Sequence, residues 1–128
     1  MAPSSFELIP EAPFDAQGLE ALRQRLASYP SYHDPVDDLY VIFGSPEERR
    51  ETVALYSRAT TPTFDVESFV QIRSARLFVH IGEEPEGRVH LRDFLDWLEE
   101  RQPLKLVHGG EEHSLNEVLP PTDDVGLA

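Results

Sequence analysis

The stretch SFVQIRSARLFVHIG, Ser68 to Gly82, contains two short runs of β-branched and aromatic residues that meet at Ser74 and Ala75. Such runs, separated by two small residues, predict two consecutive strands. Segments with helical patterns lie on both sides of the pair. Two strands in tandem between two helices are typical of a split βαβ arrangement, so this stretch decides the fold class.

The clearest helical pattern follows the strand pair. Leu91, Phe94, Leu95 and Leu98 have the spacing i, i+3, i+4 and i+7, which predicts an amphipathic helix from Leu91 to Arg101. The preceding stretch EEPEG, residues 83–87, is interpreted as a turn. After the helix, LKLVH, a Gly-Gly pair and EEHSL predict a strand, a two-residue turn and a return strand.

The segment before the strand pair begins with LYVIFG, residues 39–44, an apolar run typical of an interior strand. Ser45, Pro46 and Glu48 then predict a helix start with a capping box. A phosphate site at this turn is not expected, because it has one glycine and no lysine. Glu47 and Glu48 also already supply negative charge where the helix dipole would attract an anion.

At the N-terminus, Asp15 is the expected cap of a helix that Pro30 ends, and residues 4–10, SSFELIP, are too short to assign. The order from Leu39 to His108 is strand, helix, strand, strand, helix, strand. We therefore predict an α+β fold with a ferredoxin-like βαββαβ antiparallel sheet and helices on one face. The N-terminal helix and a C-terminal hairpin strand are additions. Residues 1–116 form one domain in this prediction, and residues 117–128 form a flexible acidic tail.

The charge of the chain restricts its partners. Of its 128 residues, 11 are lysine or arginine and 24 are aspartate or glutamate, giving a formal charge of −13, and there is no cysteine. Such a field repels nucleic acid and anionic membranes and favours basic protein surfaces. The first residues carry no basic group, and no apolar run is long enough to span a bilayer. We expect neither a signal peptide nor a membrane span, and a cytoplasmic location suits a chain without cysteine.

No catalytic motif accompanies this charge, so the sequence predicts a protein without enzymatic activity and without a cofactor. The function expected is that of an acidic protein-binding domain, such as an inhibitor or a toxin-neutralising immunity protein, that acts on a basic partner. The residues expected to bind the partner lie in the EEPEG turn and on the last helix: Glu83, Glu84, Glu86, Asp96, Trp97 and Glu100.

Two alternatives remain open from the sequence. If Gly109 and Gly110 form the hairpin turn, then His108, Glu111 and His113 lie on one face and suit a zinc or nickel ion. The other alternative is an accessory domain that forms a homodimer through an edge strand or through the face that carries Trp97.

Overall fold

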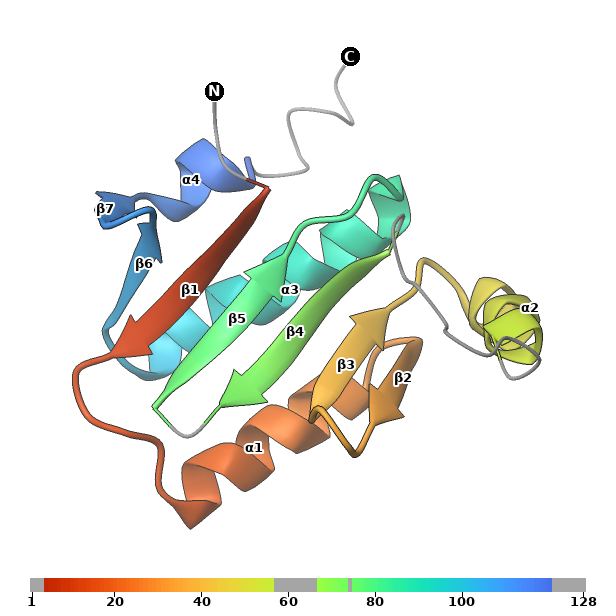
Figure 1. Ribbon diagram of the computed structural model, residues 1–128, viewed down its shortest axis with the longest axis horizontal. Coiled ribbons are helices and arrows are strands. Elements are labelled where there is room, and N and C mark those ends of the chain that lie inside the picture. The colour runs from red at the N-terminus through yellow and green to blue at the C-terminus, as the bar shows by residue number, and fades with distance from the viewer. Residues whose placement is uncertain (1–3, 57–66, 74, 121–128) are drawn as a thin grey trace.

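The computed structural model describes residues 4–56, 67–73 and 75–120. Within these residues the chain forms an antiparallel sheet of seven strands and four helices, so the predicted α+β class is confirmed (Figure 1). The elements in chain order are β1 Ser5–Pro10, α1 Ala16–Ala27, β2 Ser31–Asp34, β3 Leu39–Ile42, α2 Pro46–Tyr56, β4 Ser68–Arg73, β5 Arg76–His80, α3 Pro85–Arg101, β6 Leu104–His108, β7 Glu111–His113 and α4 Leu115–Val118.

The order of the strands differs from the predicted one. The sheet runs β2-β3-β4-β5-β1-β6-β7, whereas the predicted ferredoxin-like frame from Leu39 to His108 requires β3 in the centre. The centre is instead occupied by β1, which pairs with β5 on one side and with β6 on the other. β3 lies beside β4, and β2, a strand that the sequence did not predict, forms the edge next to it.

The reason for this order lies in the N-terminal strand. The six residues of β1 alternate between half-buried and buried, and Phe6 and Leu8 are 1% and 4% exposed. Such alternation gives one face to the core, and the strand's backbone is bonded along both edges. A strand that is buried only at alternate positions therefore fills the central position that the continuous apolar run of β3 was expected to take.

The hydrophobic core lies between one face of the sheet and the helices α1 and α3. In Figure 1, α3 passes behind the central strands β1, β5 and β4. Alternate residues of the strands pack against apolar residues of both helices. The fully buried members with the largest side chains include Phe6, Leu22, Leu26, Leu77, Leu91, Phe94, Leu95 and Leu98.

The two core helices are joined at their surface by a polar contact. The Tyr29 hydroxyl donates to Asp93 at 2.5 Å, and Arg25 donates to the same carboxylate at 2.8 Å. The hydrogen bond from Tyr29 holds the pKa of the Asp93 carboxyl below its ordinary value, and Arg25 adds to this effect. This contact fixes α1 beside the middle of α3.

Helix α3 begins earlier than predicted. Its first residue is Pro85, and the Glu84 carboxylate caps it by accepting from the backbone N–H groups of Glu86 and Gly87 at 3.1 and 2.5 Å. Proline suits the first helical position because the missing N–H has no partner there in any case. The stretch 83–87, interpreted as a turn, is therefore mostly the first turn of a helix.

The C-terminal boundary also differs from the prediction. Ser114 caps the short helix α4, and Val118 and Leu119 are 4% and 2% exposed within the core. Arg92 donates to the carbonyl oxygen of Leu119 at 2.5 Å. The packed chain thus extends beyond residue 116 to Leu119, and residues 121–128 of the predicted tail lie outside the described residues.

Candidate functional site

Three elements meet at Gly44, two residues after β3. Helix α2 begins two residues later, and the first turn of α3 lies against the same glycine. A Cβ atom at Gly44 would lie only 2.6 Å from Oε2 of Glu84 and 3.0 Å from Oε2 of Glu48. A side chain here would displace these carboxylates, so the glycine lets them approach the backbone closely. Two acidic side chains from different helices therefore converge on one point of the backbone.

The start of each helix positions its own carboxylate. In α2, Ser45 Oγ accepts from the backbone N–H of Glu48 at 3.1 Å, as expected for the predicted cap. In α3, Glu84 is itself the cap. Both side chains thus lie where the helix dipoles favour negative charge. Glu86, in the first turn of α3, brings its Cβ within 2.9 Å of the same point above Gly44.

A fourth carboxylate belongs to Glu67, the residue before β4. Its side chain is 6% exposed, and its Oε2 atom is buried without a hydrogen-bond partner. Burying a carboxylate oxygen without a partner costs free energy that a donor would recover. We call Glu48, Glu67, Glu84 and Glu86 together the carboxylate cluster.

The carboxylates of the cluster interact electrostatically with one another. Burial raises the pKa of the Glu48 carboxyl above its ordinary value, and the negative charges of Glu84, Glu67 and Glu86 raise it further. A backbone hydrogen bond at Gly44 acts in the opposite direction. Among the described residues, no cluster carboxylate forms an ion pair with a lysine, arginine or histidine. The cluster is a concentration of negative charge without an ion-pair partner among these residues, and the His90 imidazole contacts the carbonyl oxygen of Gly44 at 3.3 Å.

The raised pKa of Glu48 predicts a pH dependence of stability. Between the ordinary pKa of 4.5 and the raised value, the folded protein binds this proton more tightly than the unfolded chain does. Stability therefore falls as the pH rises through that range. Glu48→Gln lacks this loss, so we expect it to gain stability relative to the wild type between about pH 4 and about pH 7.

Urea unfolding of both proteins at the two pH values measures this gain. Glu99→Gln is the matched control, because Glu99 is exposed on α3 and lies outside the cluster. A difference between Glu48→Gln and the wild type that stays constant with pH would contradict the coupling described for Glu48.

No family model matches this chain. The comparisons with curated proteins and with solved structures likewise find no match. No helix in the described ranges combines the length and apolar character needed to cross a membrane. The chemistry of the site is therefore inferred from the residues of this chain.

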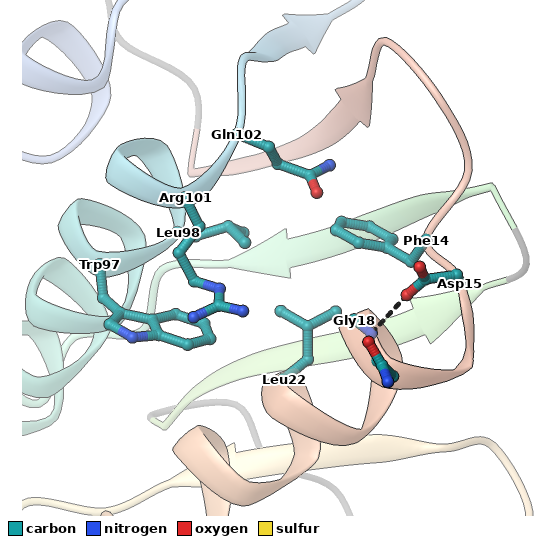
Figure 2. A pocket seen from close by; sticks show the side chains of 9 residues that line it. Phe14, Asp15, Gly18, Leu22, Trp97, Leu98, Arg101 and Gln102 are labelled. Carbon is teal, nitrogen blue, oxygen red and sulfur yellow. Dashed lines mark hydrogen bonds between the residues drawn. The ribbon is translucent and has the colours of Figure 1, made fainter.

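The remaining predicted binding residues lie on a second surface, near the C-terminal end of α3. Figure 2 shows the half-buried Trp97 side chain beside the guanidinium group of Arg101, whose carbon lies 4.9 Å from the ring centroid. Arg25 lies 5.5 Å from the same ring. A pocket of about 240 Å³ opens here between α1 and α3. Its lining consists of Phe14, Asp15, Gln17, Gly18, Leu22, Trp97, Leu98, Arg101 and Gln102.

The predicted site residues thus divide into two groups. Glu84 and Glu86 belong to the carboxylate cluster, and Glu83 is the residue before Glu84 in the chain. Asp96, Trp97 and Glu100 lie further along α3. With a rise of 1.5 Å per residue, Glu86 and Glu100 are about 20 Å apart along the helix axis. Asp96 is also paired with Arg92 at 3.1 Å, one helical turn away. The structure does not bring the two groups together.

The hairpin that carries the predicted metal ligands has the expected register. Gly109 and Gly110 have φ values of 59° and 82°, and His108 pairs with Glu111. His108 and His113 have ring centroids 6.4 Å apart, but Nδ1 of His113 contacts Glu117 Oε1 at 3.0 Å. Within the described part of the chain, no group of three or more His, Cys, Asp or Glu side chains is arranged to hold a metal ion.

The sequence does not predict two members of the cluster as binding residues. It assigns Glu48 to the helix start, as a cap residue and a source of negative charge, and it gives Glu67 no role. Glu67 is separated from Glu48 by the remainder of α2 and residues 57–66, so no local pattern relates them. The available signal was the single glycine between β3 and α2, which indicates a close approach of other groups to the backbone.

Proposed function

We propose that this protein is a binding domain without enzymatic activity that associates with a basic partner protein through the carboxylate cluster. The observation that carries the proposal is the buried, unpartnered carboxylate oxygen of Glu67, together with the lack of ion pairs at the cluster among the described residues. A cationic group of a partner provides the missing charge. An inhibitor or immunity protein that acts in the cytoplasm is the concrete form of this function.

The overall charge supports the same proposal. With a formal charge of −13, the protein attracts a basic partner over several ångströms and repels an acidic one. Charge complementarity of this kind raises association rates and excludes partners of the wrong sign. The negative charge is distributed over the whole surface, and the cluster is the place where the partner makes its specific contact.

The surface around Trp97 suits a basic partner less well than the cluster does. Arg25 and Arg101 lie close to the Trp97 ring and place two positive charges at this end of the molecule. Asp96 is already paired with Arg92. A cationic partner gains less here than at the cluster, where the acidic groups lack such pairing.

We also propose a finer description of the fold. In the order β4-β5-β1-β6, the strands of the unit β1-α1-β4 alternate with those of the unit β5-α3-β6. This is the split βαβ arrangement of a ferredoxin-like frame. In this description β2, β3 and α2 are an insertion between α1 and β4. The insertion supplies Gly44 and Glu48, so it completes the cluster that begins at α3.

The experiment that tests the function uses a partner captured from the native host by the immobilised protein and then purified. We expect the double variant Glu83→Gln, Glu86→Gln to bind this partner with a lower association rate than the wild type. Neither residue caps a helix, so folding is preserved. The matched control is Glu11→Gln, Glu112→Gln, which changes the net charge equally at exposed positions outside the cluster.

The two variants separate a local effect from a global one. If the cluster is the contact, the first variant slows association more than the control does. Equal rates for both variants would contradict a contact at the cluster. Recovery of only neutral or acidic partners would contradict the proposed function itself.

A further inference from the structure

We propose that the pocket between α1 and α3 binds a small monocarboxylate that also carries a compact apolar group. This inference goes beyond the proposed function, because the pocket and the carboxylate cluster are different surfaces. The pocket lies at the C-terminal end of α3, beside Trp97 and Arg101. Glu86 lies in the first turn of the same helix, about 20 Å away along its axis at a rise of 1.5 Å per residue.

The pocket has room for a small organic molecule. Its volume is about 240 Å³. One water molecule occupies about 30 Å³ in the liquid, so this space equals that of about eight water molecules and suits a ligand of roughly ten non-hydrogen atoms. Gly18 lines the pocket without filling it, because it has no side chain.

The buried part of the lining is apolar. Leu22 and Leu98 are 1% and 2% exposed, and the half-buried rings of Phe14 and Trp97 line the same space. All four side chains belong to the hydrophobic core or pack against it. An apolar group that enters the pocket therefore leaves water and gains the free energy of burial against these side chains.

The charge of the pocket that lacks a partner is positive. Figure 2 shows the Arg101 side chain reaching past the Trp97 ring into the space that Leu22 and Leu98 line. A guanidinium that lies over an aromatic ring keeps N–H donors at its edges. Among the described residues, Arg101 forms neither an ion pair nor a side-chain hydrogen bond. Its donors are therefore available to a ligand.

Charge balance favours a monocarboxylate over a cation or a phosphate. Asp15 is the acidic residue of the lining, and its carboxylate already accepts from the Gly18 N–H at 2.7 Å as the cap of α1. Arg101 is the basic residue of the lining, and a carboxylate matches its single charge with two parallel hydrogen bonds. A phosphate carries up to about two charges, which one guanidinium does not balance and which the formal charge of −13 repels.

The test compares three probes of similar shape and different charge: phenylacetate, neutral phenylacetamide and the cation phenethylammonium. NMR titration of the full chain follows the backbone amide of Gly18 and the indole N–H of Trp97, the only tryptophan in the sequence. We expect saturable shifts of both signals and a dissociation constant for phenylacetate of about 1 mM or lower. The amide of Gly44, at the carboxylate cluster, should stay in place.

The order of the affinities decides the proposal. Phenylacetate should bind roughly three- to tenfold more tightly than phenylacetamide, and the cation should bind more weakly still. The overall charge alone would produce the opposite order, with the cation bound most tightly. That opposite order, equal affinities, or the absence of saturable shifts would each overturn the proposal. Acetate that binds as tightly as phenylacetate would also overturn it, because the apolar group would then contribute nothing.

Variants connect the binding to the guanidinium of Arg101. Arg101 is exposed, so Arg101→Gln should fold, bind phenylacetate roughly three- to tenfold more weakly, and bind phenylacetamide within about twofold of the wild type. Arg50→Gln is the matched control, because Arg50 is exposed on α2 and its replacement changes the net charge equally. An Arg101→Gln protein that binds phenylacetate as the wild type does, or an equal loss in Arg50→Gln, would contradict the role of Arg101.

The two proposals fail separately. If phenylacetate binds while the captured partner is acidic, the pocket stands and the proposed function fails. If association with a basic partner depends on Glu83 and Glu86 while phenylacetate does not bind, the proposed function stands and the pocket does not.

Discussion

Replacing Phe6 with alanine is expected to lower the free energy of unfolding by about 3 to 5 kcal/mol. Phe6 is 1% exposed and belongs to the largest fully buried side chains of the core. It lies on β1, which is bonded to β5 and β6 along both edges. Truncation leaves a cavity at the centre of the sheet, where neighbouring strands cannot close it without breaking their ladders.

Urea unfolding measures this loss, with Val36→Ala as the control for a surface position, because Val36 is 88% exposed. If alanine prevents folding, Phe6→Leu provides a smaller truncation whose cost should still exceed that of the control. A loss for Phe6→Ala of less than about 1 kcal/mol would contradict the central position of β1.

Replacing Leu95 with alanine is expected to cost about 2 to 5 kcal/mol. Leu95 is 2% exposed and lies in the middle of the apolar face that α3 turns toward the sheet. Its neighbours Leu91, Phe94 and Leu98 are buried as well, so little space is available for relaxation. The cost is set by the lost apolar contacts and by the cavity that remains.

The control for this substitution is Val89→Ala on the same helix, where the side chain is 42% exposed and a change within about 0.5 kcal/mol is expected. Both variants keep the helical backbone, so the comparison isolates burial. Equal effects at the two positions would show that Leu95 does not face the core.

Much of the local structure follows from the sequence. The Asp15 cap, the Ser45 cap and the hairpin turn at Gly109 and Gly110 all occur where their residue types predict them. These features depend on the hydrogen bonds and dihedral angles of a few adjacent residues. The N-cap at Glu84 was missed because glutamate is not among the preferred cap residues, and only Pro85 indicated the helix start.

The order of the strands did not follow from the sequence. In β1 only alternate residues are buried, and such a strand gives a weaker signal than the continuous apolar run of β3. Position in a sheet depends on pairing between strands that are distant in the chain. Phe6 pairs with Val79, for example, and no local pattern in either segment identifies the other.

The candidate site was predictable only in part, because it also depends on contacts between residues that are distant in the chain. Charge identified Glu83, Glu84 and Glu86, because a dense acidic stretch is visible in the sequence. Glu67 became a candidate only through its burial and its unpartnered oxygen, which are properties of the folded chain. Trp97 is half-buried between arginines, an environment that its position in the helical pattern did not indicate.

The salt dependence of association tests most directly whether this protein binds a basic partner through its carboxylates. The association rate of the purified partner is measured at low salt and at about 0.15 M salt, where the Debye length is about 8 Å. The proposed function predicts a steep fall in the rate, and a shallower fall for the variant Glu83→Gln, Glu86→Gln. An association rate that does not change with salt would contradict it.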